Sequence, residues 1–247
     1  MQVELDEPCR REHSAMTGRV MSLALALSFL TGTRAQAQAE PPLSAFSKRK
    51  AETLLKEQLP CLGCHTLNGE GGSIGPDLTT VRERRSALYI QAIVANPQGT
   101  VPGAAMPRIR MPDATRALVV RYLASLPGGS PEGPIPISAP ATPPATPDGK
   151  ALYAKWCASC HGTSGEGDGP NASRLPVKPA AHASRDAMSA RPDDSLFDTI
   201  ASGGAVMNRS PRMPAFGGSL TTAEIRALVR HIRALCRCEG PSWSRTP

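Results

Sequence analysis

The chain has 247 residues and a formal net charge of +7; only 4% of its residues are aromatic, while 25 are proline and 22 are glycine. This length allows two modest domains, and so few aromatic side chains exclude a large aromatic core. No basic run with interleaved aromatic residues is present, so a nucleic-acid partner is not expected.

The first 39 residues have the features of an export signal. Arg19 precedes an apolar run from Val20 to Leu30, and small residues alternate with glutamines from Ala35 to Ala39. This pattern predicts a signal peptide cleaved after residue 37 or 39, with residues 1–15 as a possible upstream extension. The alternative is an uncleaved anchor, but the apolar run is too short to span a bilayer. We therefore expect a periplasmic protein with no transmembrane segment in the mature chain.

Residues 40–126 are predicted to form a first domain that begins and ends with a helix. The segment from Ser44 to Glu57 sets a few apolar side chains among lysines and glutamates. Residues 114–125 place Leu118, Val119, Tyr122 and Leu123 at helical spacing. The part between them is rich in glycine and proline and is predicted to be loop.

Residues 127–147 form a linker, because eight of these 21 residues are proline. Such a segment is semi-rigid and partly extended as polyproline II.

A second domain, 148–236, then repeats the pattern of the first, followed by a tail at 237–247. Asp148 is predicted to cap its first helix. Thr221 and Glu224 are predicted to start a final helix over residues 221–235, and the middle is again predicted to be loop.

The sequence Cys-x-x-Cys-His occurs once in each domain. The first copy runs from Cys61 through Cys64 to His65, and the second from Cys157 through Cys160 to His161. This pentapeptide is the attachment signature of c-type haem, in which both thiols bond one haem and the histidine ligates its iron. The alternatives are zinc sites or redox dithiols, but zinc needs four clustered ligands. A redox dithiol needs no adjacent histidine.

Both domains resemble class I cytochromes c. In that family a helix leads into the attachment motif, a Gly-Pro loop follows, then a Met-Pro loop and a last helix that crosses the first. The resemblance implies a mainly α fold, two cytochrome c domains joined by a Pro-rich linker, and two covalently bound haem c groups. It also implies that the carbonyls of Pro76 and Pro170 accept hydrogen bonds from His65 and His161, which orients each imidazole.

The sulfur ligand of each iron is expected from a methionine before the last helix. In the second domain Met213 fits the family pattern, and Met207 is its competitor. In the first domain both Met106 and Met111 precede a proline; the distance from Met106 to the last helix is closer to that in the second domain. We expect Met106 to be the ligand and keep Met111 as the alternative. His182 is expected at the surface.

Cys236 and Cys238 depart from the family pattern. They form a Cys-Arg-Cys sequence after the final helix, with no histidine following, so they are not a haem site. In an oxidising compartment they could bond each other or a partner, or remain as two free thiols.

These features predict an electron carrier rather than an enzyme. A histidine and a methionine on each iron leave no open position for a substrate, so the expected partners are a redox protein donor and acceptor. The net positive charge favours an acidic docking surface on such a partner, and docking on a membrane complex is compatible with it. The alternative is a dihaem enzyme, peroxidase-like or sulfur-oxidising, with an exchangeable ligand on the first haem.

Overall fold

The computed structural model describes residues 41–129 and 146–244. The predicted signal peptide and most of the predicted linker lie outside the described residues. The described residues belong to one compact unit. None of their helices is long and apolar enough to cross a membrane.

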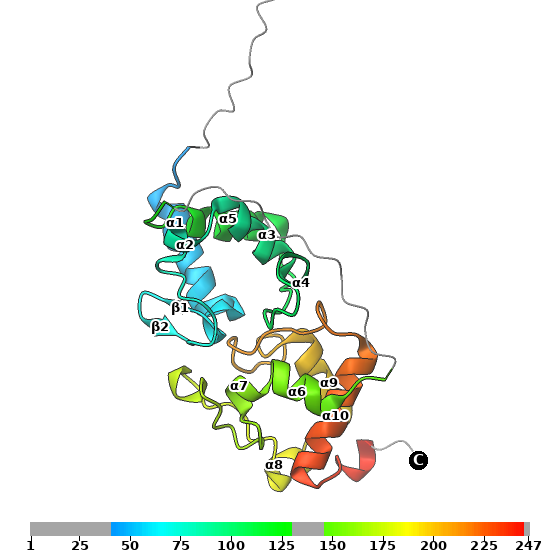
Figure 1. Ribbon diagram of the computed structural model, residues 1–247. Coiled ribbons are helices and arrows are strands. Elements are labelled where there is room, and N and C mark those ends of the chain that lie inside the picture. The colour runs from blue at the N-terminus through cyan, green and yellow to red at the C-terminus, as the bar shows by residue number, and fades with distance from the viewer. Residues whose placement is uncertain (1–40, 130–145, 245–247) are drawn as a thin grey trace, which may run out of the picture. The chain divides into compact units, whose positions relative to one another are not determined.

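The first half of the described chain contains helices and one short hairpin (Figure 1). Its helices are α1 (Ala45–Thr53), the π-helical η1 (Leu54–Gln58), the 3-10 helix η2 (Pro60–Gly63), α2 (Val81–Arg84), α3 (Ala87–Ala95), α4 (Pro97–Thr100) and α5 (Asp113–Ala124). The hairpin pairs β1 (Thr66–Leu67) with β2 (Glu70–Gly71) in antiparallel fashion.

The first helix delivers the chain to the first attachment motif. The Ser44 side chain accepts a hydrogen bond from Ser47 N and so caps α1. The helix widens into η1, where Leu59 N donates to Leu54 O, and Pro60 then opens η2. The helix predicted over residues 44–57 therefore exists, but its second half is π-helical.

The last helix of the first half holds this segment in place. α5 packs against α1 and α3, and it buries Val119, Tyr122 and Leu123. The Tyr122 hydroxyl donates to Glu52 Oε1 at 3.0 Å, which links the last helix to the first.

The second half of the described chain is also helical. Its elements are α6 (Gly149–Trp156), α7 (Ala158–His161), the 3-10 helix η3 (Ala172–Arg174), α8 (Arg185–Ser189), α9 (Asp193–Ser202), α10 (Thr222–Cys236) and the 3-10 helix η4 (Ser242–Ser244).

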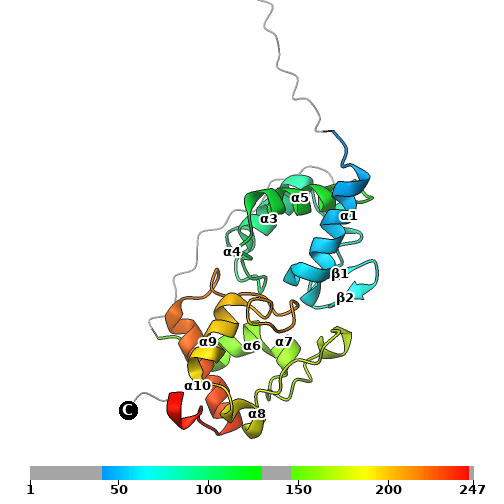
Figure 2. The same ribbon diagram turned by 180° about the vertical axis from the view of Figure 1, so that it is seen from behind.

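Capping side chains start α6 and α10 where the sequence predicts them. Asp148 Oδ1 accepts hydrogen bonds from Lys150 N and Ala151 N. At α10 the Thr221 side chain accepts from Glu224 N, while the Glu224 carboxylate accepts from Thr221 N, which completes a capping box. α10 packs against α6 and α9 (Figure 2).

Five α-helices lie where loop was predicted, so that prediction is wrong for α2, α3, α4, α8 and α9. The longest of them are α3 and α9. α3 is capped by Ser86, whose side chain accepts from Tyr89 N. α9 has two aspartates in its first turn and buries Leu196, Thr199 and Ile200 along one face. Acidic side chains at a helix start are favourable because they complement its dipole.

The buried apolar residues form two separate clusters, one in each half of the described chain. The first gathers side chains from α1, η2, α3 and α5, and the second from α6, α8, α9 and α10. Two cores of this kind agree with two helical domains, each built around its own site.

Candidate functional site

The first Cys-x-x-Cys-His motif is a tight turn at the end of η2. Cys64 N and His65 N both donate to Cys61 O, at 3.2 and 2.9 Å. The turn places both cysteines and the histidine on the wall of one cavity. Leu62, between the cysteines, is fully buried in the first core cluster and anchors the turn.

The second motif repeats this turn in α7. Cys160 N and His161 N donate to Cys157 O, at 3.1 and 2.9 Å. All three residues line the same cavity as the first motif. Ala158 takes the place of the buried leucine and belongs to the second core cluster. The two motifs thus present the same groups in the same local geometry.

Each proximal imidazole is oriented by a backbone carbonyl. His65 Nδ1 donates to Pro76 O at 2.7 Å, the contact that the family resemblance leads us to expect. His161 Nδ1 donates to Ala180 O at 2.9 Å. Since a carbonyl can only accept, each Nδ1 carries the proton and each Nε2 keeps its lone pair for a metal.

The expectation for Pro170 is wrong, because Ala180 holds that position. Gly169 N donates to Cys160 O, which brings the Gly-Pro segment beside the motif as in the first domain. The chain then turns away in η3 directly after Pro170, and it returns to the imidazole only at Ala180.

His182 is buried, so the expected surface position is also wrong. Its ring stacks on the His161 ring with centroids 4.1 Å apart and an interplanar angle of 13°. Its Nδ1 shares a hydrogen bond of 3.0 Å with the Tyr153 hydroxyl. Burial first, then the neighbouring His161 and Arg191, hold the pKa of His182 well below its usual value, so it packs as a neutral ring.

Three of the methionines singled out above line the cavity, namely Met106, Met111 and Met213. Met207 is not among the lining residues. Gln98 Nε2 donates to Met106 O at 2.5 Å and fixes that residue from α4. Gly204 N donates to Met213 O at 3.0 Å. The cavity therefore has a candidate sulfur ligand in each half.

The cavity has a volume of about 980 Å³ and is lined mainly by apolar side chains. Seven basic side chains also line it, among them Arg84, Lys155 and Arg209, and no aspartate or glutamate does. A haem has a large apolar ring and two propionates, so an apolar wall with cationic groups fits it. The donor set of two thiols, one imidazole and one thioether in each half fits haem c.

Burial disfavours the thiolate form of the attachment cysteines. Burial raises the pKa of Cys61 to about 11 and that of Cys157 to about 12. Thiols that retain their protons at neutral pH are poor nucleophiles and poor metal ligands. A thioether is uncharged, so its burial carries no such cost.

Asn171 joins the two attachment motifs and was not anticipated from the sequence. Its side chain is fully buried. Nδ2 donates to Gly63 O at 2.5 Å and lies 3.5 Å from Cys160 Sγ, while Oδ1 accepts from Ser73 N at 3.0 Å. Burial, and then the nearby Cys160, raise the pKa of Cys64 to about 12. The Asn171 side chain therefore contacts the backbone of the first motif and a sulfur atom of the second.

Further contacts surround this junction. Gly63 leaves no room for a side chain, because a Cβ there would lie 2.2 Å from Arg212 O. Arg212 Nη1 donates to Leu55 O at 3.5 Å, and Arg108 N donates to Ser219 Oγ at 2.7 Å. Backbone segments next to Met106 and Met213 thus take part in the contact between the two halves.

Two family matches cover most of the described residues. Residues 49–127 match the family described as cytochrome c. Residues 144–232 match the family described as cytochrome c oxidase, cbb3-type, subunit III. No curated protein is similar enough to the chain to match.

Among solved structures, the chain is similar to one in the Kuenenia stuttgartiensis reducing HAO-like protein complex Kustc0457/Kustc0458. The sequence identity is 21%, the match covers 78% of this chain and 96% of that chain, and the TM-score is 0.30.

Each matched family segment contains one complete attachment motif with its histidine. Cytochrome c domains bind haem c covalently and transfer electrons. The chain is therefore a dihaem c-type cytochrome, in which two tandem and mainly helical cytochrome c domains each hold one covalently bound haem.

Proposed function

We propose that this cytochrome carries single electrons between a donor and an acceptor redox protein, with its two haem sites acting in series. The contact between the attachment motifs carries the proposal, since Asn171 reaches both Gly63 O and Cys160 Sγ. Sites whose attachment loops touch offer a shorter path for an electron than sites separated by a linker. Two docked sites therefore suit a relay.

Four side chains would hold the two haem irons. His65 and His161 present Nε2, because their Nδ1 protons are held by carbonyls. Met106 and Met213 present neutral thioethers, which favour reduced iron and raise its potential. Bound haem c supplies the redox-active iron. If the histidine and the methionine of each half both held the haem iron, no coordination position would remain for a substrate, which favours a carrier over a dihaem enzyme.

The residues of the chain fix the second imidazole on two sides. Ala180 O accepts its Nδ1 proton, and the His182 ring covers one of its faces. Tyr153 in turn holds His182 through its hydroxyl. A ligand that cannot rotate keeps the same geometry in both oxidation states, which lowers the reorganisation that accompanies each electron.

We propose that the protein works in the periplasm and docks on its partners through the rim of the haem sites. The predicted signal peptide supports the location. The basic side chains along the cavity support a partner with an acidic surface, although haem propionates will neutralise part of this charge. The match to a family described as an oxidase subunit supports docking on a membrane complex.

Alanine variants at Met106 and Met111 test the carrier role. We expect Met106→Ala to remove the methionine-to-ferric-iron charge-transfer absorption of one haem, and Met111→Ala to leave it unchanged. The wild-type resting protein should bind neither peroxide nor cyanide at low concentration, because a histidine and a methionine would already hold each iron.

The dihaem-enzyme alternative predicts a different pattern. Wild-type protein would then bind peroxide readily at one haem, and Met106→Ala would not alter the absorption. Either result would refute the assignment of Met106, and ready peroxide binding would refute the carrier role.

A further inference from the structure

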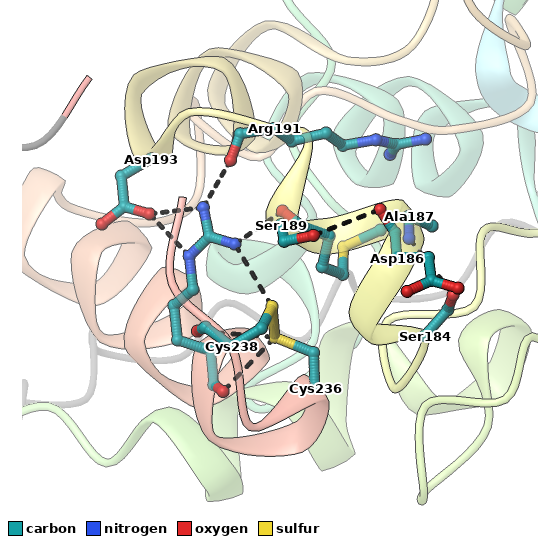
Figure 3. The surroundings of a disulfide bond; sticks show 10 residues. Ser184, Asp186, Ala187, Ser189, Arg191, Asp193, Cys236 and Cys238 are labelled. Atoms are coloured by element: carbon teal, nitrogen blue, oxygen red, sulfur yellow. Dashed lines mark hydrogen bonds and ion pairs between the residues drawn. A yellow bond between two sulfur atoms is a disulfide. The ribbon is translucent and has the colours of Figure 1, made fainter. Parts of the chain in front are cut away.

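We infer that the Cys236–Cys238 disulfide is a thiol-exchange site that accepts electrons from small anionic thiols. The two cysteines are bonded to each other at the end of α10. Neither lines the haem cavity. Figure 3 shows the bond beside a network that joins α10 to α8 and to the start of α9.

The spacing of the cysteines gives the bond little structural value. A disulfide stabilises a fold mainly by restricting the unfolded chain, and the effect falls as the closed loop becomes shorter. This bond encloses a single residue, Arg237. α10 is already fixed by its capping box and by a face of six buried residues. A role other than cross-linking is therefore favoured.

The enclosed residue has a left-handed backbone conformation. Arg237 has φ 48° and ψ 44°, in the left-handed region. A residue with a Cβ occupies this region at a cost in free energy. Helix-ending hydrogen bonds also hold this conformation, since Arg237 N donates to Ala234 O and Cys238 N to Arg233 O, at 3.4 and 3.3 Å. Reduction therefore removes one of the constraints on Arg237.

A fixed positive charge lies beside the bond. Arg233 Nε donates to Asp193 Oδ1 at 2.7 Å, and its two Nη atoms donate to Met188 O and Arg191 O at 2.7 and 2.5 Å. These bonds hold Nη1 at 3.8 Å from Cys238 Sγ (Figure 3). A guanidinium at this position stabilises a thiolate. Stabilising the reduced form makes a disulfide easier to reduce.

The disulfide also borders a pocket that suits an anion. The pocket has a volume of about 510 Å³ and is lined by Arg185, Arg233, Arg237, Cys238 and Glu239. Arg233 is paired with Asp193 at 2.7 Å. The other two guanidinium groups, of Arg185 and Arg237, face a single carboxylate, that of Glu239, and this balance favours a negatively charged ligand. Cys238 lines the pocket and is 9% exposed, whereas Cys236 does not line it and is 3% exposed. Cys238 is therefore the sulfur that an external thiol reaches.

The exchange proceeds in two steps. The external thiolate attacks Cys238 Sγ, a new disulfide forms, and the electron pair of the broken bond leaves on Cys236 Sγ, which takes up a proton. A second thiolate then attacks the external sulfur of the mixed disulfide. The external disulfide is released, and this electron pair remains on Cys238 Sγ beside Arg233. Two external thiols are oxidised to one disulfide, and the protein disulfide is reduced to two thiols.

Reduction of the holoprotein by three thiols of different charge tests the proposal. Mercaptoacetate is anionic, mercaptoethanol is neutral and cysteamine is cationic, and the three are compared at equal thiolate concentration. The protein thiols released are counted by mass spectrometry after alkylation. We expect mercaptoacetate to react about tenfold faster than cysteamine at low salt, with the preference shrinking as salt screens the pocket.

Two arginine variants test whether the preference for the anionic thiol arises in this pocket. Arg237→Gln is expected to reduce the preference for mercaptoacetate, because it removes one cation from the pocket. Arg230→Gln is the control, since Arg230 is an exposed arginine of the same helix that does not line the pocket. Two results would overturn the proposal. One is a bond that resists all three thiols until the protein unfolds, and the other is a set of rates that do not depend on thiol charge.

Discussion

Replacing Gly63 with alanine is expected to separate the two haem-attachment motifs. The new Cβ would lie 2.2 Å from Arg212 O, a backbone atom that cannot rotate away. Overpacking of this kind costs about 1–3 kcal/mol. A shift of Gly63 away from Arg212 also moves Gly63 O, which accepts the hydrogen bond from Asn171 Nδ2. The free energy that holds the two domains together should fall by at least the cost of overpacking.

Small-angle X-ray scattering of the holoprotein measures this separation. The radius of gyration of Gly63→Ala should exceed that of the wild-type protein, while both haems remain attached. Ser159→Ala is the matched control at the same place in the second motif, because it keeps the carbonyl that accepts from Asn171 N. Equal radii for the wild-type protein and Gly63→Ala would show that this contact does not hold the domains together.

Met213→Ala is expected to have the second large effect. The substitution removes a thioether from the wall of the haem cavity, where Gly204 N holds the backbone of Met213. The second haem should lose its methionine charge-transfer absorption, have a lower potential and bind cyanide. Because Met213 is only partly buried, the free energy of unfolding should fall by about 2 kcal/mol, at the low end for Met→Ala.

Met207→Ala is the control for this prediction. Met207 lies in the same loop region but does not line the cavity. The absorption spectrum and the haem potentials of the Met207→Ala protein should therefore match those of the wild-type protein. The assignment of Met213 as the ligand would be wrong if Met207→Ala lost the charge-transfer absorption and Met213→Ala kept it.

The spacing of apolar residues predicted the helices that bury only one of their faces. α5 and α10 bury one face and expose the other, so their apolar residues recur at helical spacing. α3 has apolar residues on all sides because one side meets the protein core, through Ile90, and another lines the haem cavity, through Tyr89 and Ile93. Such a helix has no periodic contrast between its faces, so no helical pattern opposed the loop that the glycine and proline content of this part of the chain predicted.

Local motifs predicted the attachment residues, since covalent chemistry and metal ligation require fixed spacing within five residues. The partners of these residues come from farther along the chain. His182 and Ala180 reach His161 through a loop whose path depends on η3 and on the bond from Ala183 N to Gly165 O. No short-range signal in the sequence encodes that path.

The contact that Asn171 makes between the two domains could not be predicted from the sequence either. A lone asparagine after a Gly-Pro pair reads as an ordinary turn residue. It becomes fully buried because the first domain covers it and supplies Gly63 O and Ser73 N as partners. A contact between domains leaves no trace in the pattern of either domain alone.

Electron paramagnetic resonance of the wild-type holoprotein tests the relay most directly. The relaxation of one low-spin ferric haem is measured in fully oxidised protein and again after the other haem has been reduced to its diamagnetic ferrous form. Docked sites predict faster relaxation when both irons are ferric and slower relaxation after half-reduction. Relaxation that does not change on half-reduction would contradict two haem sites in contact.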